Sequence, residues 1–308
     1  MLTSLILPPG AIGKIPANGD FIRINAGDPV AQHLAVWLQA GFESVIRVNA
    51  TLPATPTPFV LSLGANRNSL VGALVPSKDQ VGREFPLAVF VPVESSLLAT
   101  RFPLVPFSFR RFIESVGALL AQTATMSTGT LQTALGRLPM PDPSDWSFAE
   151  EQRRLQLDKS SANLMKQFSE PEPSGLHYAA RTFLMACSAE RGQEPAKARV
   201  VLDCPIGTDG PLAWLELAAR ILCWREQPPS FMWTDAEPPR LLLALGPIPA
   251  TALGYLARPD RPVAVFWPLK TTQKAAMDAA RQALSEEQRR TLEDGQSSLE
   301  TLFTHLAR

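Results

Sequence analysis

Prolines mark the boundaries of many of the regular elements that this sequence can form. The chain of 308 residues contains 29 prolines, nearly twice the usual share of about 5%. They cluster at the ends of apolar runs, where a residue with a fixed φ angle and no amide donor ends a strand or sets a turn. The sequence therefore predicts a folded chain of many short elements joined by defined turns.

Length and composition predict a folded protein. A chain of 308 residues suits two domains of ordinary size, the working prediction, although a single large α/β domain is also compatible with this length. Hydrophobic residues make up 45% of the chain and charged residues only 19%, so each half has enough apolar surface for a core. Twenty-nine lysines and arginines balance 29 aspartates and glutamates. Because this balance leaves no net field to attract phosphates, we expect no nucleic-acid partner.

The hydrophobic segments are too short or too interrupted to cross a bilayer. The opening stretch 2–7 lacks a basic flank and does not resemble a secretory signal. The longest apolar region, 241–257, is interrupted by glycines and prolines and falls short of the roughly 20 apolar residues of a spanning helix. We therefore expect no membrane insertion and a cytoplasmic location. Cys187, Cys204 and Cys223, widely spaced in apolar segments, favour buried free thiols in a reducing compartment over disulfides or metal ligands.

Apolar periodicity predicts the order of the elements. Asp28 and Pro29 form an N-cap and first-turn pair, and apolar residues then recur at helical spacing as far as Val45. Three β-prone runs separated by polar turns predict an antiparallel meander, and a helix follows them. The three runs are at 59–63, 70–75 and 87–93, and the helix after them is at 107–123. Further strands are expected at 199–204, 230–234, 241–245 and 263–268, and further helices at 146–168, 175–190, 211–225 and 271–306.

The proline-rich stretch 138–144, LPMPDPS, marks a domain boundary. We expect an N-terminal domain over 1–140 and a C-terminal α/β domain over 145–308. The fold class is α/β (α+β), with two modules that each hold a mostly antiparallel or mixed sheet flanked by helices, because tight turns pair strands antiparallel. The order strand, helix, three strands, helix occurs in 12–124 and again in 199–306, which hints at two similarly built modules. We expect these modules to be longin- or roadblock-like, and they could be duplicates.

Bulky aromatic and charged side chains have predicted environments as well. Four tryptophans lie in apolar periodic runs and are expected in the core, two lie near element ends and are candidates for exposed anchors, and a charged group is expected on a solvated helix face. The tryptophans expected in the core are Trp37, Trp214, Trp224 and Trp233, and the candidate exposed anchors are Trp146 and Trp267. The charged group expected on a solvated helix face is Glu150, Glu151, Arg153 and Arg154.

Two loop segments carry the most information about function. The first, GKIPANGDF at 13–21, is not a phosphate-binding P-loop, because Pro8 and Ile15 stand where that motif needs a glycine and a serine or threonine. The second, VPSKDQVGREFPL at 75–87, joins two strands through a turn with both charge signs. One interpretation is local: Asp79 caps backbone amides and Arg83 pairs with Asp79 or Asp20. The alternative is a functional surface.

Both segments resemble the TagF (ImpM) family of type VI secretion system accessory proteins. Family members open with glycine-lysine-leucine-proline and glycine-aspartate-phenylalanine, continue with a helix ending in Trp-Leu-Gln, here residues 37–39, and then carry a stretch similar to 75–87. Residues 228–235, PPSFMWTD, are similar to a segment of longer members. Asn18 replaces the usual arginine, and 57–60 lacks a tryptophan often found there.

The resemblance implies a post-translational negative regulator that binds and sequesters the forkhead-associated scaffold protein of the secretion system, without a cofactor or a metal. Some members carry a fused PP2C-type phosphatase, but its metal-binding aspartates are not matched by the isolated pairs at 209–210 and 294–295. The partner surface expected from the resemblance comprises Lys14, Pro16, Gly19, Asp20, Phe21, Ser77, Asp79, Gly82, Arg83 and Phe85.

Catalysis is not expected from the motifs present. His33, His177 and His305 are distributed one per predicted helix, and the sequence has no HExxH, CxxC or Gly-x-Ser-x-Gly motif. We therefore expect that the protein is not an enzyme. Two alternatives stay open at this point: an enzyme of unknown substrate, which requires a deep polar pocket, and a longin- or roadblock-type platform for a small GTPase.

Overall fold

The computed structural model describes residues 6–166, 168, 175–193, 199–207, 210–261 and 263–307. The strands are β1 (Gly10–Gly13), β2 (Ile22–Ile24), β3 (Thr57–Leu61), β4 (Asn68–Val75), β5 (Leu87–Glu94), β6 (Val201–Pro205), β7 (Ser230–Thr234), β8 (Arg240–Ala244) and β9 (Phe266–Pro268). The helices of the first part are α1 (Pro29–Arg47), α2 (Ser95–Ala99), α3 (Val105–Ser108), α4 (Arg110–Gln122) and α5 (Thr128–Leu135), with 3-10 turns η2 (Phe102–Leu104) and η3 (Thr123–Thr125). Those of the second part are α6 (Pro143–Leu157), α7 (Ala162–Lys166), α8 (Gly175–Ala189), α9 (Leu212–Leu222), α10 (Ala252–Ala257), α11 (Lys274–Ala283), α12 (Glu286–Glu293) and α13 (Leu299–Leu306).

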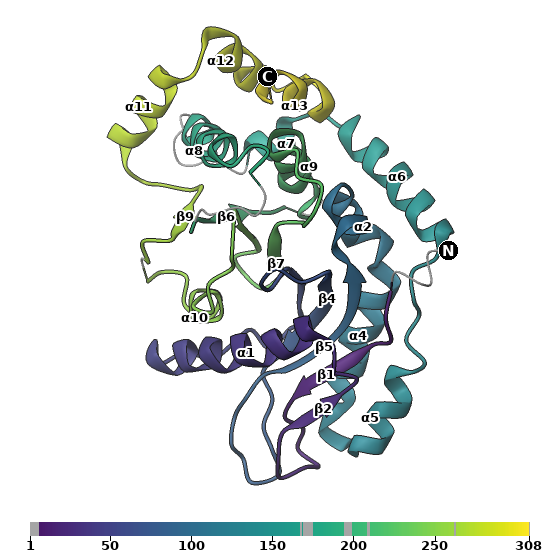
Figure 1. The fold of residues 1–308 in the computed structure, drawn as a ribbon. Coiled ribbons are helices and arrows are strands. Elements are labelled where there is room, and N and C mark those ends of the chain that lie inside the picture. The colour runs from purple at the N-terminus through teal and green to yellow at the C-terminus, as the bar shows by residue number, and fades with distance from the viewer. Residues whose placement is uncertain are drawn as a thin grey trace.

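All nine described strands belong to one sheet. Their order is β2-β1-β5-β4-β3-β7-β8-β6-β9, so the strands of the first part occupy one side and those of the second part the other (Figure 1). The two groups join where β3 and β7 pair antiparallel, with Phe59 opposite Met232 and Val60 opposite Phe231. These four side chains are fully buried, so the junction is part of the core.

The expected fold class, α+β with a mixed sheet flanked by helices, is confirmed. Every described pairing is antiparallel except the one between β6 and β9. The sequence does not predict that the strands of the two modules pair with each other and form one continuous sheet. The two parts also differ in order, because β5 lies between β1 and β4, whereas β9 lies outside β6 at the edge.

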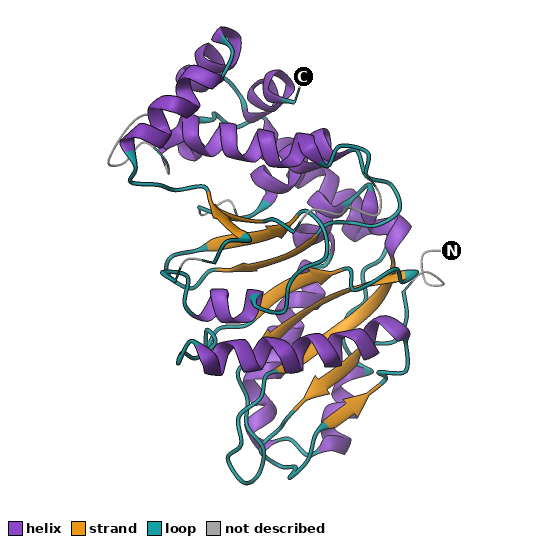
Figure 2. Cartoon of the chain, turned by 60° about the vertical axis from the view of Figure 1, so that its left-hand side comes forward, coloured by secondary structure: helices purple, strands orange, loops and turns teal. Residues whose placement is uncertain are grey.

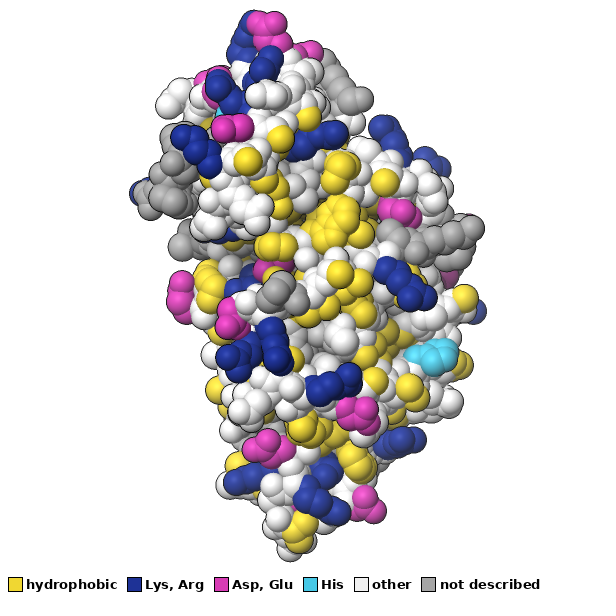
Figure 3. Space-filling model, turned by 90° about the vertical axis from the view of Figure 1, so that its left-hand side faces the viewer, with side chains coloured by type: hydrophobic (Ala, Val, Ile, Leu, Met, Phe, Trp, Pro, Cys, Tyr) yellow, Lys and Arg dark blue, Asp and Glu magenta, His cyan; other side chains and the backbone are white. Residues whose placement is uncertain are grey.

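Helices cover both faces of the sheet (Figure 2). One face packs against α1 and α10, and the other packs against α3, α4, α5, α6, α8, α9 and α13. Strands β4 and β5 are buried along almost their whole length, as expected for strands covered on both sides. Seen from the left-hand side of Figure 1, hydrophobic side chains gather along the middle of the molecule, and charged side chains are scattered around them from the upper to the lower end (Figure 3). None of the described helices is long and apolar enough to cross a membrane.

The helix signals at the start of α1 are confirmed. Asp28 has extended backbone angles, and its carboxylate accepts the Val30 amide at 2.9 Å, while Pro29 occupies the first turn. Helix α10 is an unpredicted element in the region 241–257. Its prolines, which suggest only interruption, precede the helix, and Gly254 lies inside it at a close contact with α1.

The burial of some tryptophan and cysteine side chains differs from the predictions. Trp37, Trp214, Trp224 and Trp233 are buried as expected, but Trp146 is also buried, since its ring packs edge-on against Phe109 at 6.0 Å. The expectation of an exposed anchor at Trp146 is therefore wrong, and Trp267 is half-buried. Cys187 and Cys204 are buried free thiols, whereas Cys223 is exposed at the end of α9.

The charged face of α6 is not simply solvated. The Arg153 guanidinium donates to both oxygens of Glu216 on α9, at 2.7 and 2.8 Å, and Arg220 donates to the same carboxylate at 2.8 Å. Arg220 also pairs with Glu300 on α13. Burial of Glu216 opposes its ionisation, but the two guanidinium groups outweigh this effect and lower the pKa. These ion pairs connect α6, α9 and α13.

Candidate functional site

The two motif loops lie side by side at the lower end of the molecule in Figure 1 and are bonded to each other. We call residues 14–21 and 76–86 together the double loop. The Gln80 amide donates to the Asn18 carbonyl at 3.0 Å, the Ser77 hydroxyl to the Lys14 carbonyl at 2.8 Å, and the Arg83 guanidinium to the Gly19 carbonyl at 2.7 Å. The two segments, more than 50 residues apart in sequence, therefore form one unit.

Asp79 is the centre of the double loop. One carboxylate oxygen accepts the amides of Val81 and Arg83 at 3.1 and 2.8 Å, and the other contacts the Lys14 ammonium at 3.0 Å and the Arg83 guanidinium at 2.7 Å. Its side chain is fully enclosed. Burial raises the pKa of this carboxyl, but hydrogen bonds from Lys14 and Arg83 outweigh burial and hold the pKa well below its usual range. Asp79 is therefore ionised and acts as a structural clamp.

An aromatic cluster lies beside the clamp. The buried ring of Phe85 makes edge-on contacts with Phe21 and Phe42 at centroid distances of 4.8 and 5.5 Å. The Lys14 ammonium lies 4.9 Å from the centroid of the Phe21 ring. Phe21 is nevertheless 46% exposed, and Val81 at the tip of the second loop is 70% exposed. The unit thus presents apolar side chains to solvent from a rigid base.

The structure brings most of the expected surface residues together. Lys14, Gly19, Phe21, Ser77, Asp79, Arg83 and Phe85 share the contacts described above. Gly82 has φ of 87°, a left-handed conformation that suits the turn between Asp79 and Arg83. Of the two partners expected for Arg83, Asp79 is the one observed. Asp20 instead accepts the amide of Phe21 at 2.8 Å and is exposed.

Pro16 and other residues of the double loop line one side of a groove of about 370 Å³. The groove separates the end of α1 from the end of α4, and Phe42, Leu52 and Leu120 contribute to its apolar walls. These residues were not predicted as part of the site, because their periodicity in the sequence marks them only as core. Val81 was not predicted as a site residue either, although an apolar residue at the centre of a polar turn indicates an exposed apolar side chain.

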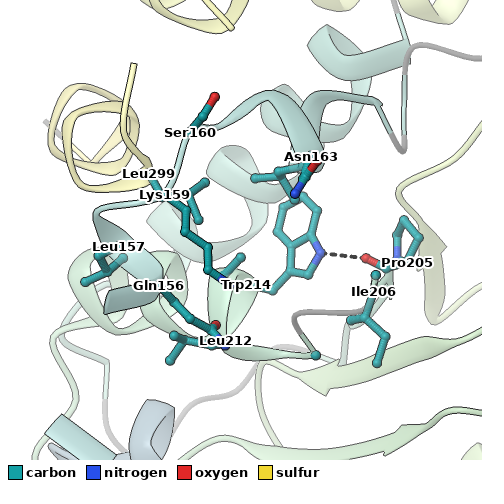
Figure 4. A pocket seen from close by; sticks show the side chains of 14 residues that line it. Gln156, Leu157, Lys159, Ser160, Asn163, Pro205, Ile206, Leu212, Trp214 and Leu299 are labelled. Atoms are coloured by element: carbon teal, nitrogen blue, oxygen red, sulfur yellow. Dashed lines mark hydrogen bonds between the residues drawn. The ribbon is translucent and has the colours of Figure 1, made fainter. Parts of the chain in front are cut away.

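A second, much smaller hollow lies among α6, α7 and α9 (Figure 4). Its volume of about 30 Å³ suits a water-sized molecule. The Trp214 indole N–H in its wall already donates to the Pro205 carbonyl at 2.8 Å. The Trp214 side chain therefore acts in packing here.

The histidines are distributed over separate places. His33 contacts Asn66, His177 faces Glu293 at 3.2 Å, and His305 faces Glu287 at 3.4 Å. Among the described residues, no group of three or more histidine, cysteine, aspartate or glutamate side chains could hold a metal ion. Asp209, part of one aspartate-glycine pair considered from the sequence, lies outside the described residues.

Comparison with known families identifies the domain that contains the double loop. Residues 10–138 match the model of the TagF N-terminal domain, described as type VI secretion system-associated. The chain is therefore a type VI secretion system-associated protein. Its N-terminal part, which contains the whole double loop, belongs to the TagF family, as the motifs predicted.

Two further comparisons complete this picture. No curated protein matches the chain. A crystal structure of PA0076 from Pseudomonas aeruginosa PAO1 is similar over 84% of this chain and 98% of that chain, with 19% sequence identity and a TM-score of 0.48.

Proposed function

We propose that this protein is a cytoplasmic negative regulator of type VI secretion that binds and sequesters a forkhead-associated scaffold protein. The observation that carries the proposal is the TagF N-terminal domain over 10–138, because this domain contains both motif loops in one bonded unit. The partner-binding surface is the exposed side of the double loop. A sequestering protein needs a complementary surface with a few anchors and no reacting group.

The physical form of the double loop supports this role. Phe21 and Val81 are exposed apolar side chains on a base held by the Lys14–Asp79 and Arg83–Asp79 ion pairs. A surface that is already ordered loses little conformational entropy on binding, which favours affinity. Exposed aromatic residues surrounded by polar ones are typical of binding hot spots.

Calorimetry with purified proteins tests the partner. The protein is titrated with the purified forkhead-associated scaffold of the same secretion system. We expect direct binding, and we expect deletion of the gene to raise secretion of the sheath-driven tube protein. No binding between the two purified proteins, with both shown to be folded, would reject sequestration as the mechanism.

A further inference from the structure

A large hollow lies at the junction of the two strand groups, away from the double loop. It has a volume of about 770 Å³, within the range of small-molecule sites. One wall comes from the turn 62–67 and the start of α2, and the other from the loop 224–230 and residues 246–247. Residues 228–230, part of the PPSFMWTD motif, therefore line a pocket that the proposed function does not use.

The walls of this pocket are mostly carbon and conformationally restricted. Trp224, Pro228, Pro229 and Pro247 contribute to them. The indole N–H of Trp224 is directed to the Glu190 carbonyl at 2.9 Å, so the ring offers an apolar surface and no donor. Such a wall suits an aliphatic chain.

Ser62 and Ser95 line one side of the pocket and are connected through the buried Ser69 by hydrogen bonds with a fixed direction. The Ser62 hydroxyl donates to the Pro228 carbonyl at 2.9 Å, so it can only accept from Ser69, 2.8 Å away. Ser69 has then used its own proton and can only accept from Ser95, also at 2.8 Å. With its proton committed, Ser95 can offer an incoming group only an acceptor.

The neighbouring carboxylate of Glu94 is an acceptor as well. One oxygen accepts the Ser96 hydroxyl at 3.0 Å, and the other is 3.3 Å from the Arg67 guanidinium. The Arg67 side chain is 81% exposed, whereas that of Glu94 is only 22% exposed. A long, exposed ion pair of this kind contributes little and is easily exchanged. Arg67 thus occupies a position that another cation could take.

We propose that this pocket binds a small ligand with a primary ammonium group on an aliphatic chain. The ammonium donates to the Glu94 carboxylate and the Ser95 hydroxyl oxygen in place of Arg67. The aliphatic chain lies against Trp224 and the proline wall. Arg225 and Glu226, which also line the pocket, carry opposite charges.

The probe is n-hexylammonium, with n-hexanol and hexanoate as neutral and anionic counterparts of the same length. Binding is followed by NMR titration of the Trp224 indole N–H signal in the full chain. We expect saturable binding of hexylammonium, at least about tenfold weaker binding of hexanol because the charge-assisted bonds are lost, and no binding of hexanoate. Equal binding of hexanol and hexylammonium, preferred binding of hexanoate, or no saturable shift would overturn the proposal.

Two variants with opposite expected effects complete the test. Glu94→Gln keeps the shape of the side chain but removes its charge, and should weaken hexylammonium binding about tenfold. Arg67→Gln removes the competing cation and should strengthen binding about two- to fivefold. Glu43→Gln, an exposed change on α1, is the control and should have no effect. If Arg67→Gln weakens binding or Glu94→Gln leaves it unchanged, the ammonium does not occupy the proposed position.

Discussion

The backbone amide of Gly254 on α10 donates to the hydroxyl of Ser44 on α1 at 3.0 Å. The Ser44 hydroxyl in turn donates to the Gly41 carbonyl at 2.6 Å. Near this contact, the Trp37 indole donates to the Ile248 carbonyl at 3.2 Å. Helix α1 belongs to the TagF N-terminal domain and α10 to the second part of the chain. These bonds, together with the β3–β7 pairing, join the two parts through both the sheet and the helices on one of its faces.

Gly254→Ala should destabilise the protein by about 1–3 kcal/mol, the usual effect of overpacking a tight core contact. A Cβ atom at this position would lie 2.7 Å from the Ser44 hydroxyl oxygen and 3.0 Å from the Ser44 carbonyl oxygen. Gly129→Ala on α5 is the matched control, since nothing lies within 4 Å of its Cβ position. The control should gain about 0.5–1 kcal/mol from helix propensity. Urea unfolding measures both, and equal effects of the two changes would contradict the close contact.

Glu216→Gln should destabilise the fold at neutral pH by about 3 kcal/mol, because it leaves two guanidinium groups near the core without their shared charge. The pKa of Glu216 is lowered in the folded state, so its contribution is complete above the ordinary value of 4.5 and is lost as pH falls through the folded value. Unfolding free energies between pH 7 and pH 3 test this sign. The difference between wild type and variant should shrink at the acid end; a difference that grows on acidification would refute the assignment.

Local patterns in the sequence determine most of the individual elements. The N-cap at Asp28, the strand runs around Phe59 and the polar turn at Asp79 depend on neighbouring residues, so they can be predicted from the sequence. Pairing of Val60 with Phe231 depends on two strand edges 171 positions apart, and periodicity contains no information on which edges meet. The same limit explains why the environment of Arg153 was predicted incorrectly. Its neighbours on the helix are typical of a solvent-exposed face, whereas its partner Glu216 lies on another helix.

The candidate site was predictable in part for the same reason. Asp79, Val81 and Arg83 lie within one turn, and the capping role of the aspartate can be recognised from that turn. The contact of Lys14 with Asp79 was not predictable from either segment alone, because it requires β1 and β4 to bring their loops to the same end of the sheet. Only the resemblance of both segments to family motifs placed Lys14 and Asp79 in the same predicted surface.

Cys223 should be the fast-reacting thiol of the native protein. It lies exposed at the end of α9, whereas Cys187 and Cys204 are buried and burial raises the pKa of both thiols. Titration with a chromogenic disulfide should release one equivalent quickly under native conditions and three equivalents in denaturant, matching the three cysteines of the sequence. Cys223→Ser should remove the fast phase. Fast labelling that persists in this variant would show that a buried thiol becomes accessible.

Val81→Asp should weaken binding of the forkhead-associated scaffold at least about tenfold, because a charge at the centre of an apolar contact must be desolvated without a partner. The matched control is Val36→Asp on α1, since Val81 and Val36 are 70% and 71% exposed and should lose equally little stability. Calorimetry with the purified scaffold compares the two, and circular dichroism confirms that both variants are folded. If both variants bind like wild type, the double loop is not the binding surface; if Val36→Asp alone reduces binding, the partner docks on α1 instead.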